Sequence, residues 1–178
     1  MNIQKAKEIP GWMDEPELIW LAQCADVSKM IAEVGCWMGR STRALADNTS
    51  GRVYAVDTWR GSEEHQGDFV GKHPDWVLNT FKDNMKDHIK DRKVVVLHMK
   101  STQAAHWMFH GNYKFNLVFI DGAHDYDNIS ADIKAWKPLM ESGGIISGHD
   151  YGHPPIRQAV NELLDSPESS GSIWYKQL

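Results

Sequence analysis

The segment 30–46 constrains the fold of this chain more than any other part of the sequence. It passes from an apolar run, 30–35, through a turn marked by Gly35 and Gly39, into residues with the spacing of an amphipathic helix. A strand, a glycine turn and a helix in this order bring bare backbone and a helix N-terminus up to a bound small molecule. The glycine spacing lacks the G-x-G-x-x-G of dinucleotide sites, so the turn favours a nucleoside ligand without a pyrophosphate.

Short apolar runs alternate with longer amphipathic segments along the chain, a pattern typical of βαβ units around a parallel sheet. Runs such as 94–97 and 117–120 are apolar throughout, as in strands that are buried on both faces. The expected strands cover residues 30–35, 52–57, 93–98, 116–121, 143–148 and 172–178. The expected helices cover residues 14–28, 40–48, 74–89, 101–109, 127–140 and 155–165. We therefore predict an α/β protein with a doubly wound, mostly parallel sheet and helices on both faces.

The C-terminal part of the sequence predicts a shortened strand region. Residues 172–178 indicate one last strand, which the hydrophilic stretch 165–172 joins to the helix before it. Gly143 and Gly144 are expected to end the helix over 127–140, because glycine is common just past a helix C-terminus.

Bulk properties indicate one soluble domain. A chain of 178 residues fits a single domain, 1–178, that is large enough to bury its own core. The net charge of −5 and the scattered lysines and arginines disfavour nucleic-acid binding. Cys24 and Cys36 do not indicate a disulfide framework, and no apolar run suits a membrane span or a signal peptide. We expect a cytoplasmic protein that binds neither nucleic acid nor membrane.

Acids and histidines follow several of the predicted strands. Asp57 ends the second strand, roughly twenty residues after the glycine turn, at a position suited to accept hydrogen bonds from ribose hydroxyls. The stretches 121–126 and 148–151 carry further acids and histidines after the fourth and fifth strands. In a doubly wound sheet the first, fourth and fifth strands are neighbours where the strand order reverses. We therefore expect these clusters to converge on one ligand site.

Four motifs, taken in order, resemble the class I S-adenosylmethionine-dependent methyltransferases. They are Glu-x-Gly-x-x-x-Gly-Arg-Ser-Thr, Val-Asp-Thr-Trp, Ile-Asp-Gly-Ala-His-Asp-Tyr and Gly-Gly-Ile-Ile-Ser-Gly-His-Asp-Tyr. The resemblance runs from about Gly11 to Ile156 and is strongest to a subgroup with macrolide sugar O-methyltransferases and cephalosporin-hydroxylase-type proteins. It implies a Rossmann-like fold and methyl transfer to a hydroxyl of a small molecule. The full fold ends in an antiparallel pair of strands, of which this sequence shows one.

The resemblance also implies where the methyl donor, S-adenosylmethionine, binds. Its methionine part would lie at the first strand end and the glycine loop, and its ribose at the end of the second strand. Its adenine would lie by the start of the helix after the third strand, where Ser101 could equally be a plain helix cap. The cofactor-binding residues implied in this way are Glu33, Gly35, Gly39, Ser41, Thr42, Asp57, Thr58, Trp59, Ser101 and Asp121.

The catalytic prediction concerns His124, with Asp121 three residues before it. An imidazole that titrates near neutrality can accept the hydroxyl proton, although His124 could instead only fix its loop. In metal-dependent relatives an acid after the fourth strand and two residues after the fifth bind a divalent ion, which here implies Asp121, His149 and Asp150. A histidine ligand leaves Mg²⁺ and Mn²⁺ both open, and also a site without metal in which His149 contacts the substrate.

Two other functions stay open at the level of sequence. Histidines His124, His149 and His153, together with Asp121 and Asp150, could supply the two-histidine, one-carboxylate iron site of a non-haem oxygenase or hydroxylase. Alternatively, the chain could bind the cofactor without turnover.

The acceptor is not named by any motif, so sugar, phenol, polyketide and small-acid hydroxyls all stay open. The glycine-punctuated segment 58–73 leaves the end of the second strand, and its length suggests a flap over the site. The acceptor pocket is therefore expected to be open, to be closed by this flap, or to be completed by a second subunit of a homo-oligomer.

Overall fold

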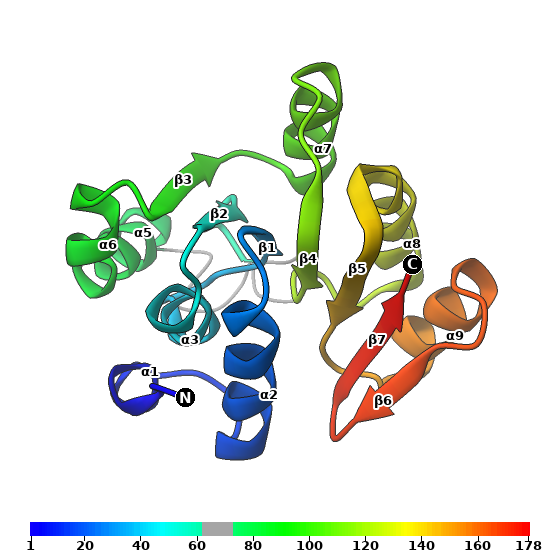
Figure 1. Cartoon of the computed structure of the whole chain (residues 1–178), viewed down its shortest axis with the longest axis horizontal. Helices are drawn as coiled ribbons and strands as arrows, with labels where there is room; N and C mark the ends of the chain where they lie inside the picture. The colour runs from blue at the N-terminus through cyan, green and yellow to red at the C-terminus, as the bar shows by residue number, and fades with distance from the viewer. Residues whose placement is uncertain (62–72) are drawn as a thin grey trace.

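The computed structural model describes residues 1–61 and 73–178, in which seven strands form one sheet of order β3-β2-β1-β4-β5-β7-β6 (Figure 1). The strands are β1 (Met30–Val34), β2 (Arg52–Asp57), β3 (Val94–His98), β4 (Phe115–Ile120), β5 (Met140–Gly148), β6 (Glu168–Ser170) and β7 (Ile173–Gln177). The first five strands are parallel, whereas β7 runs antiparallel to both β5 and β6. The doubly wound, mostly parallel sheet predicted from the sequence is therefore confirmed.

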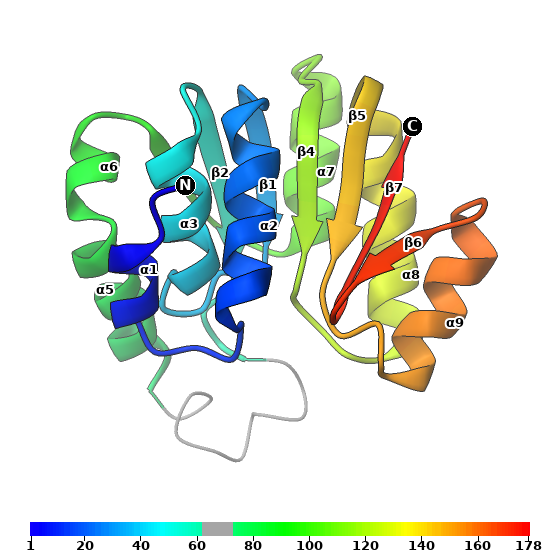
Figure 2. The same cartoon turned by 60° about the horizontal axis from the view of Figure 1, so that its bottom comes forward.

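Helices cover both faces of this sheet (Figure 2). They are α1 (Gln4–Glu8), α2 (Glu15–Asp26), α3 (Arg40–Asn48), α5 (Pro74–Asn84), α6 (Lys86–Lys90), α7 (Ser101–His110), α8 (Tyr126–Trp136), the 3₁₀ helix η2 (Lys137–Leu139) and α9 (Pro154–Leu163). The predicted helix over 74–89 is two helices, and α1 was not predicted because five residues show too little periodicity. None of the helices in the described ranges is long and apolar enough to cross a membrane.

The alternation of side chains along the strands explains why the sheet has a hydrophobic core on each of its two faces. Ile31 and Val53 point to the core beneath α1, α2, α3 and α5. Their neighbours Ala32 and Tyr54 point to the opposite core, which α7, α8 and α9 cover. Because successive side chains of a strand face opposite sides, a strand that is apolar at every position needs helices on both faces.

The C-terminal region corrects one prediction, because it contains two strands rather than one. The short strand β6 lies within the stretch expected to be a linker and pairs with β7 from Glu168–Tyr175 to Ser170–Ile173. The sequence Glu-Ser-Ser has no apolar position, and all three residues are exposed, so a hydrophobic pattern could not reveal this strand.

Gly143 and Gly144 also lie elsewhere than predicted, because they belong to β5 and do not end a helix. The helical segment stops earlier, at η2, where Pro138 lacks the N–H group that a longer helix needs. Gly143 has a φ of 80° and falls where the pairing of β5 with β4 shifts register. Glycine meets both needs of this irregularity, since it accepts positive φ and adds no side chain to the strand.

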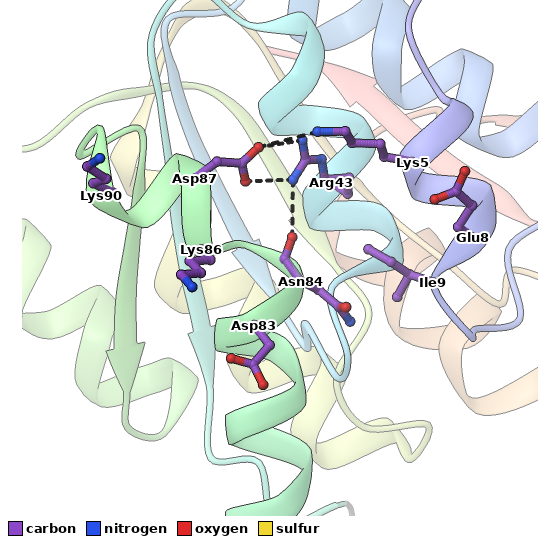
Figure 3. A pocket seen from close by; sticks show the side chains of 9 residues that line it. All are labelled: Lys5, Glu8, Ile9, Arg43, Asp83, Asn84, Lys86, Asp87 and Lys90. Atoms are coloured by element: carbon purple, nitrogen blue, oxygen red, sulfur yellow. Dashed lines mark hydrogen bonds and ion pairs between the residues drawn. The ribbon is translucent and has the colours of Figure 1, made fainter.

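A charge network around the buried Arg43 attaches α6 to α3, and Figure 3 shows the contact of Arg43 with Asp87. The Arg43 guanidinium contacts Asp47 at 3.0 Å and Asp87 at 2.7 Å, and His88 lies 2.7 Å from the second oxygen of Asp47. The Arg43 and Asp47 side chains are 5% and 6% exposed, so water can reach neither charge well. Each charge therefore depends on the other for stabilisation.

The same network forms one wall of a groove of about 700 Å³. The groove is lined by Lys5, Glu8, Ile9, Arg43, Asp83, Asn84, Lys86, Asp87 and Lys90. None of these residues is among the predicted cofactor, catalytic or metal-binding residues, and Arg43 is already paired. We therefore assign the groove to helix packing and place the functional site elsewhere.

The substitution Arg43→Ala is expected to lower the free energy of unfolding by about 3 kcal/mol, because it leaves Asp47 buried without its guanidinium partner. Urea denaturation at pH 7 measures this change. Lys86→Ala removes an exposed lysine from the same groove and should stay within about 0.5 kcal/mol of the wild type. Equal destabilisation by the two substitutions would contradict a structural role for the network.

Candidate functional site

The carboxyl ends of the central strands meet at one edge of the sheet. Val34 pairs with Val56 on one side and Ile120 on the other, and Ile120 pairs with Gly148. The strand order reverses at β1 and β4, which is where open α/β sheets bind ligands. The three clusters expected to converge therefore start from neighbouring strand ends.

The loop after β1 depends on two glycines. Gly35 has a φ of 83°, and a Cβ atom there would lie 2.0 Å from the backbone oxygen of Asp121. Gly39 has a φ of 93° and occupies the N-cap position of α3. Only glycine satisfies a positive φ and so close a backbone approach together. The predicted strand, glycine turn and helix are thus present, with α3 beginning at Arg40.

Asp57 holds this loop from the end of β2. One carboxylate oxygen accepts hydrogen bonds from the backbone N–H groups of Cys36 at 2.8 Å and Trp37 at 2.9 Å. The other oxygen accepts the N–H of Trp59 at 2.7 Å. Burial raises the pKa of Asp57, and these N–H donors act in the opposite direction.

Glu33 lies one residue before the end of β1 and is fully buried. Its Oε2 accepts a hydrogen bond from the Thr42 hydroxyl at 2.5 Å, whereas its Oε1 has no hydrogen-bond partner. The pKa of Glu33 is raised to about 7, mainly by burial and also by the nearby Asp121 charge, whereas hydrogen bonding by Ser41 and Thr42 acts in the opposite direction. A buried acceptor without a partner is uncommon and calls for a ligand or a water molecule.

Three other predicted cofactor residues are engaged inside the protein. Trp59 is 1% exposed, packs against Phe81 and donates a hydrogen bond to the backbone oxygen of Trp37. The Ser101 hydroxyl accepts a hydrogen bond from Trp136, and the backbone oxygen of Thr58 contacts the His98 ring. Trp59 can thus offer a nucleoside little more than its backbone.

The acids and histidines after β4 and β5 form one compact cluster. Asp121, His124 and Asp150 place a ligand atom each within 4.8 Å of one another, the one such metal-capable group among the described residues. His124 Nε2 lies 3.2 Å from Asp150 Oδ2, and both side chains are 25% exposed. Hydrogen bonds from His124 and His149 lower the pKa of Asp150, whereas burial raises that of Asp121 to about 6.

His149, the third predicted metal ligand, lies beside this cluster but is not part of it. The ring is buried, with Nε2 3.1 Å from Glu17 Oε1 and Nδ1 3.3 Å from Asp150 Oδ1. The distance from Nδ1 to Asp121 Oδ1 is 3.9 Å. Burial lowers the pKa of His149, but the hydrogen bond with Asp150 and the surrounding acids outweigh it and raise this pKa to about 9.

The structure also shows contacts of residues near the glycine loop to which the sequence assigned no specific role. Arg40 donates hydrogen bonds to the backbone oxygens of Met13 and Ile9 and thereby holds the segment before α2 against the glycine loop. On that segment the Trp12 ring packs against the Trp37 ring at a tilt of 40°, with 4.4 Å between the ring centroids, and Trp37 has a φ of 43°. No local pattern could reveal these contacts, because the partners lie far apart in the sequence.

The predicted flap over 58–73 lies mostly outside the described residues, since 62–72 are not among them. The flap therefore stays a prediction.

Comparison with known proteins places the chain in a family. Residues 32–151, which include the strand-end cluster and the glycine loop, match a family model described as a methyltransferase domain. Because this match spans more than half of the chain, the protein belongs to that methyltransferase family. This agrees with the resemblance seen in the sequence motifs.

Solved structures share the fold at low sequence identity. An O-methyltransferase from Bacillus cereus in complex with SAH has a TM-score of 0.69 and 19% identity, over 97% of this chain and 86% of that one. The calicheamicin methyltransferase CalS11 has a TM-score of 0.68 and 17% sequence identity, over 90% of this chain and 76% of that chain. A precorrin 8W decarboxylase from Methanobacterium thermoautotrophicum has a TM-score of 0.68 and 15% sequence identity, over 97% of this chain and 95% of that chain. At such identities these likenesses show the fold alone.

Glu33→Gln is expected to make stability less dependent on pH. Folding raises the pKa of Glu33 from 4.5 to about 7. Between pH 4.5 and pH 7 the folded protein therefore binds more protons at this side chain than the unfolded chain does. Stability then falls as pH rises through this window, by up to about 3 kcal/mol from Glu33. Urea denaturation between pH 5 and 7.5 should show the variant gaining stability relative to the wild type as pH rises.

The exposed acid Glu141 provides the control, because Glu141→Gln should leave the pH dependence as it is. Parallel stability curves for Glu33→Gln and the wild type would show that Glu33 is not a buried acid of raised pKa.

Proposed function

We propose that this protein transfers the methyl group of S-adenosylmethionine to a hydroxyl group of a small molecule. The observation that carries the proposal is the position of the Asp121–His124–Asp150 cluster next to the glycine loop. Gly35 touches the backbone of Asp121, so the loop suited to a nucleoside and the cluster suited to proton transfer share one sheet edge. Membership of the methyltransferase family supports the reaction type.

The donor set at this edge fits the methyl donor. Asp57 Oδ1 accepts one backbone N–H, so it keeps a free lone pair for a ribose hydroxyl. Glu33 Oε1 is a buried acceptor without a hydrogen-bond partner. The ammonium group in the methionine part of S-adenosylmethionine would donate the missing hydrogen bond. Gly35, whose N–H donates to Val56, lets the glycine loop lie close to Asp121 at the same edge.

His124 is the general base in this proposal. When bound, S-adenosylmethionine supplies an electrophilic methyl group on a sulfonium that departs as a thioether. His124 accepts the acceptor's hydroxyl proton as the oxygen forms its bond to carbon, and Asp150, 3.2 Å away, stabilises the resulting imidazolium. The protein adds alignment and exclusion of water, which such an in-line displacement needs most.

The cluster also fits a divalent ion, which is the second possibility for its role. Two carboxylates and one imidazole suit Mn²⁺ better than Mg²⁺, since Mg²⁺ prefers oxygen ligands alone. Such an ion, held by Asp121, His124 and Asp150, would lower the pKa of the acceptor hydroxyl. An imidazole nitrogen that binds an ion cannot accept the proton, so the two roles of His124 exclude each other.

The hydroxylase alternative has less support. A two-histidine, one-carboxylate site needs a second imidazole beside His124, but the metal-capable group in the described part of the chain contains one histidine. The Nε2 atom of His149 faces Glu17, and the ring of His153 lies 5.7 Å from that of His124.

Binding of the methyl donor is the first test. Calorimetry should detect S-adenosylmethionine binding in the micromolar range to the wild type, and Asp57→Ala should weaken it at least about tenfold, because a hydrogen bond to a charged group is lost. His124→Gln should leave this binding unchanged. Absence of binding by the wild type, with or without Mn²⁺, would refute the proposal.

The base is tested by release of S-adenosylhomocysteine with a panel of sugar and phenol acceptors. His124→Gln should lower kcat by about 10²-fold or more, because a general base is removed. His106→Gln changes an exposed histidine on α7 and serves as the control. Activity that survives thorough chelation supports His124 as the base, whereas activity restored by Mn²⁺ alone assigns His124 to an ion.

A further inference from the structure

Glu17 in the first turn of α2 joins three segments that are far apart in the sequence. Its Oε2 accepts the backbone N–H of Asp14 at 2.9 Å, which completes a capping box. Its Oε1 accepts the backbone N–H of Ser172 at 3.3 Å and lies 3.1 Å from His149 Nε2. The side chains of Glu17 and His149 are each 9% exposed, so solvent is largely excluded from this contact.

The acceptor-only chemistry of Glu17 determines how His149 is oriented. An ionised carboxylate has no hydrogen to donate, so the contact at 3.1 Å requires a hydrogen on His149 Nε2. The backbone of His149 is held separately, since its N–H donates to Ile120 and its oxygen accepts from Trp174. With Nε2 directed at Glu17, the Nδ1 edge of the ring faces Asp150 Oδ1 at 3.3 Å.

Asp150 continues this series of contacts to the active site. Its Oδ1 faces His149, and its Oδ2 lies 3.2 Å from His124 Nε2. The backbone of Asp150 has a φ of 59°, which is uncommon for a residue other than glycine. The contacts to both carboxylate oxygens therefore hold the Asp150 side chain in place, although the backbone of Asp150 has an unfavourable φ.

We propose that Glu17 is a positioning residue, which acts through His149 and Asp150 to orient His124 for its reaction. The catalytic part rests on the proposed function, whereas the series Glu17–His149–Asp150–His124 rests on the contacts between these side chains alone. Where His124 accepts a proton, Asp150 orients its imidazole. Where Asp121, His124 and Asp150 hold an ion, Glu17 and His149 instead fix Asp150 as one of its ligands.

Glu17→Gln tests the proposal. Three donors converge on the carboxylate, but an amide has one acceptor oxygen, so the variant cannot satisfy both Asp14 and His149. We expect kcat to fall by about tenfold, with the affinity for S-adenosylmethionine unchanged. Glu15→Gln removes an exposed carboxylate from the same helical turn and should leave kcat as it is.

A double-mutant cycle separates positioning from a merely structural role. If Glu17 acts through His149, Glu17→Gln should reduce kcat little further in a His149→Gln background. If Glu17 only fastens α2 to the β6–β7 hairpin, it should reduce the free energy of unfolding in both backgrounds and leave the kcat of the folded protein unchanged. That result would overturn the proposal.

A readout independent of turnover covers the case in which no acceptor is methylated. Nitrogen-15 NMR of the histidine rings should show a proton on His149 Nε2 in the wild type, and a shift or loss of its signal in Glu17→Gln, whereas the Nδ1 edge still faces Asp150. The ring signals of His124 should shift in the same variant and not in Glu15→Gln. Unchanged His124 signals would refute the positioning role, whatever reaction the protein catalyses.

Discussion

The close contact between the ends of β1 and β4 is the constraint on which the site depends. Gly35 lies so near the backbone of Asp121 that a single Cβ atom could not be placed there. This approach brings the glycine loop and the Asp121–His124–Asp150 cluster to the same edge of the sheet. A larger residue at position 35 would separate the strand ends and, with them, the two halves of the proposed reaction.

Buried acids at this edge create an electrostatic cost that the surrounding chain offsets in different ways. Asp57 is compensated by three backbone N–H groups, and Asp150 by two imidazoles. Glu33 and Asp121 are less well compensated, and burial raises the pKa of each. Buried acids with raised pKa values are typical of functional sites, and Glu33 and Asp121 lie at the same edge of the sheet.

The sequence predicted much of the fold and part of the site. Apolar runs over five strands and the turn at Gly35 and Gly39 are local signals, so they could be recognised directly. The strand β6 was not predicted, because Glu-Ser-Ser carries no apolar pattern. Gly143 and Gly144 were assigned to a helix end, because a register shift in a strand and a helix end both use glycine. Asp57 and His124 were singled out by their positions after strands, but the burial of the Trp59 ring could not be foreseen.

By itself, the sequence determined the alternation of the five parallel strands with helices and the chemical types of residue at the strand ends, because both follow from local periodicity and spacing. Only the tertiary structure decided which of these residues meet. His149 faces Glu17, 132 residues away, and Asp150 divides its two oxygens between His149 and His124. Such pairings depend on how α2 and the β6–β7 hairpin pack against the end of β5, and this information is distributed over the whole chain rather than held in any one motif.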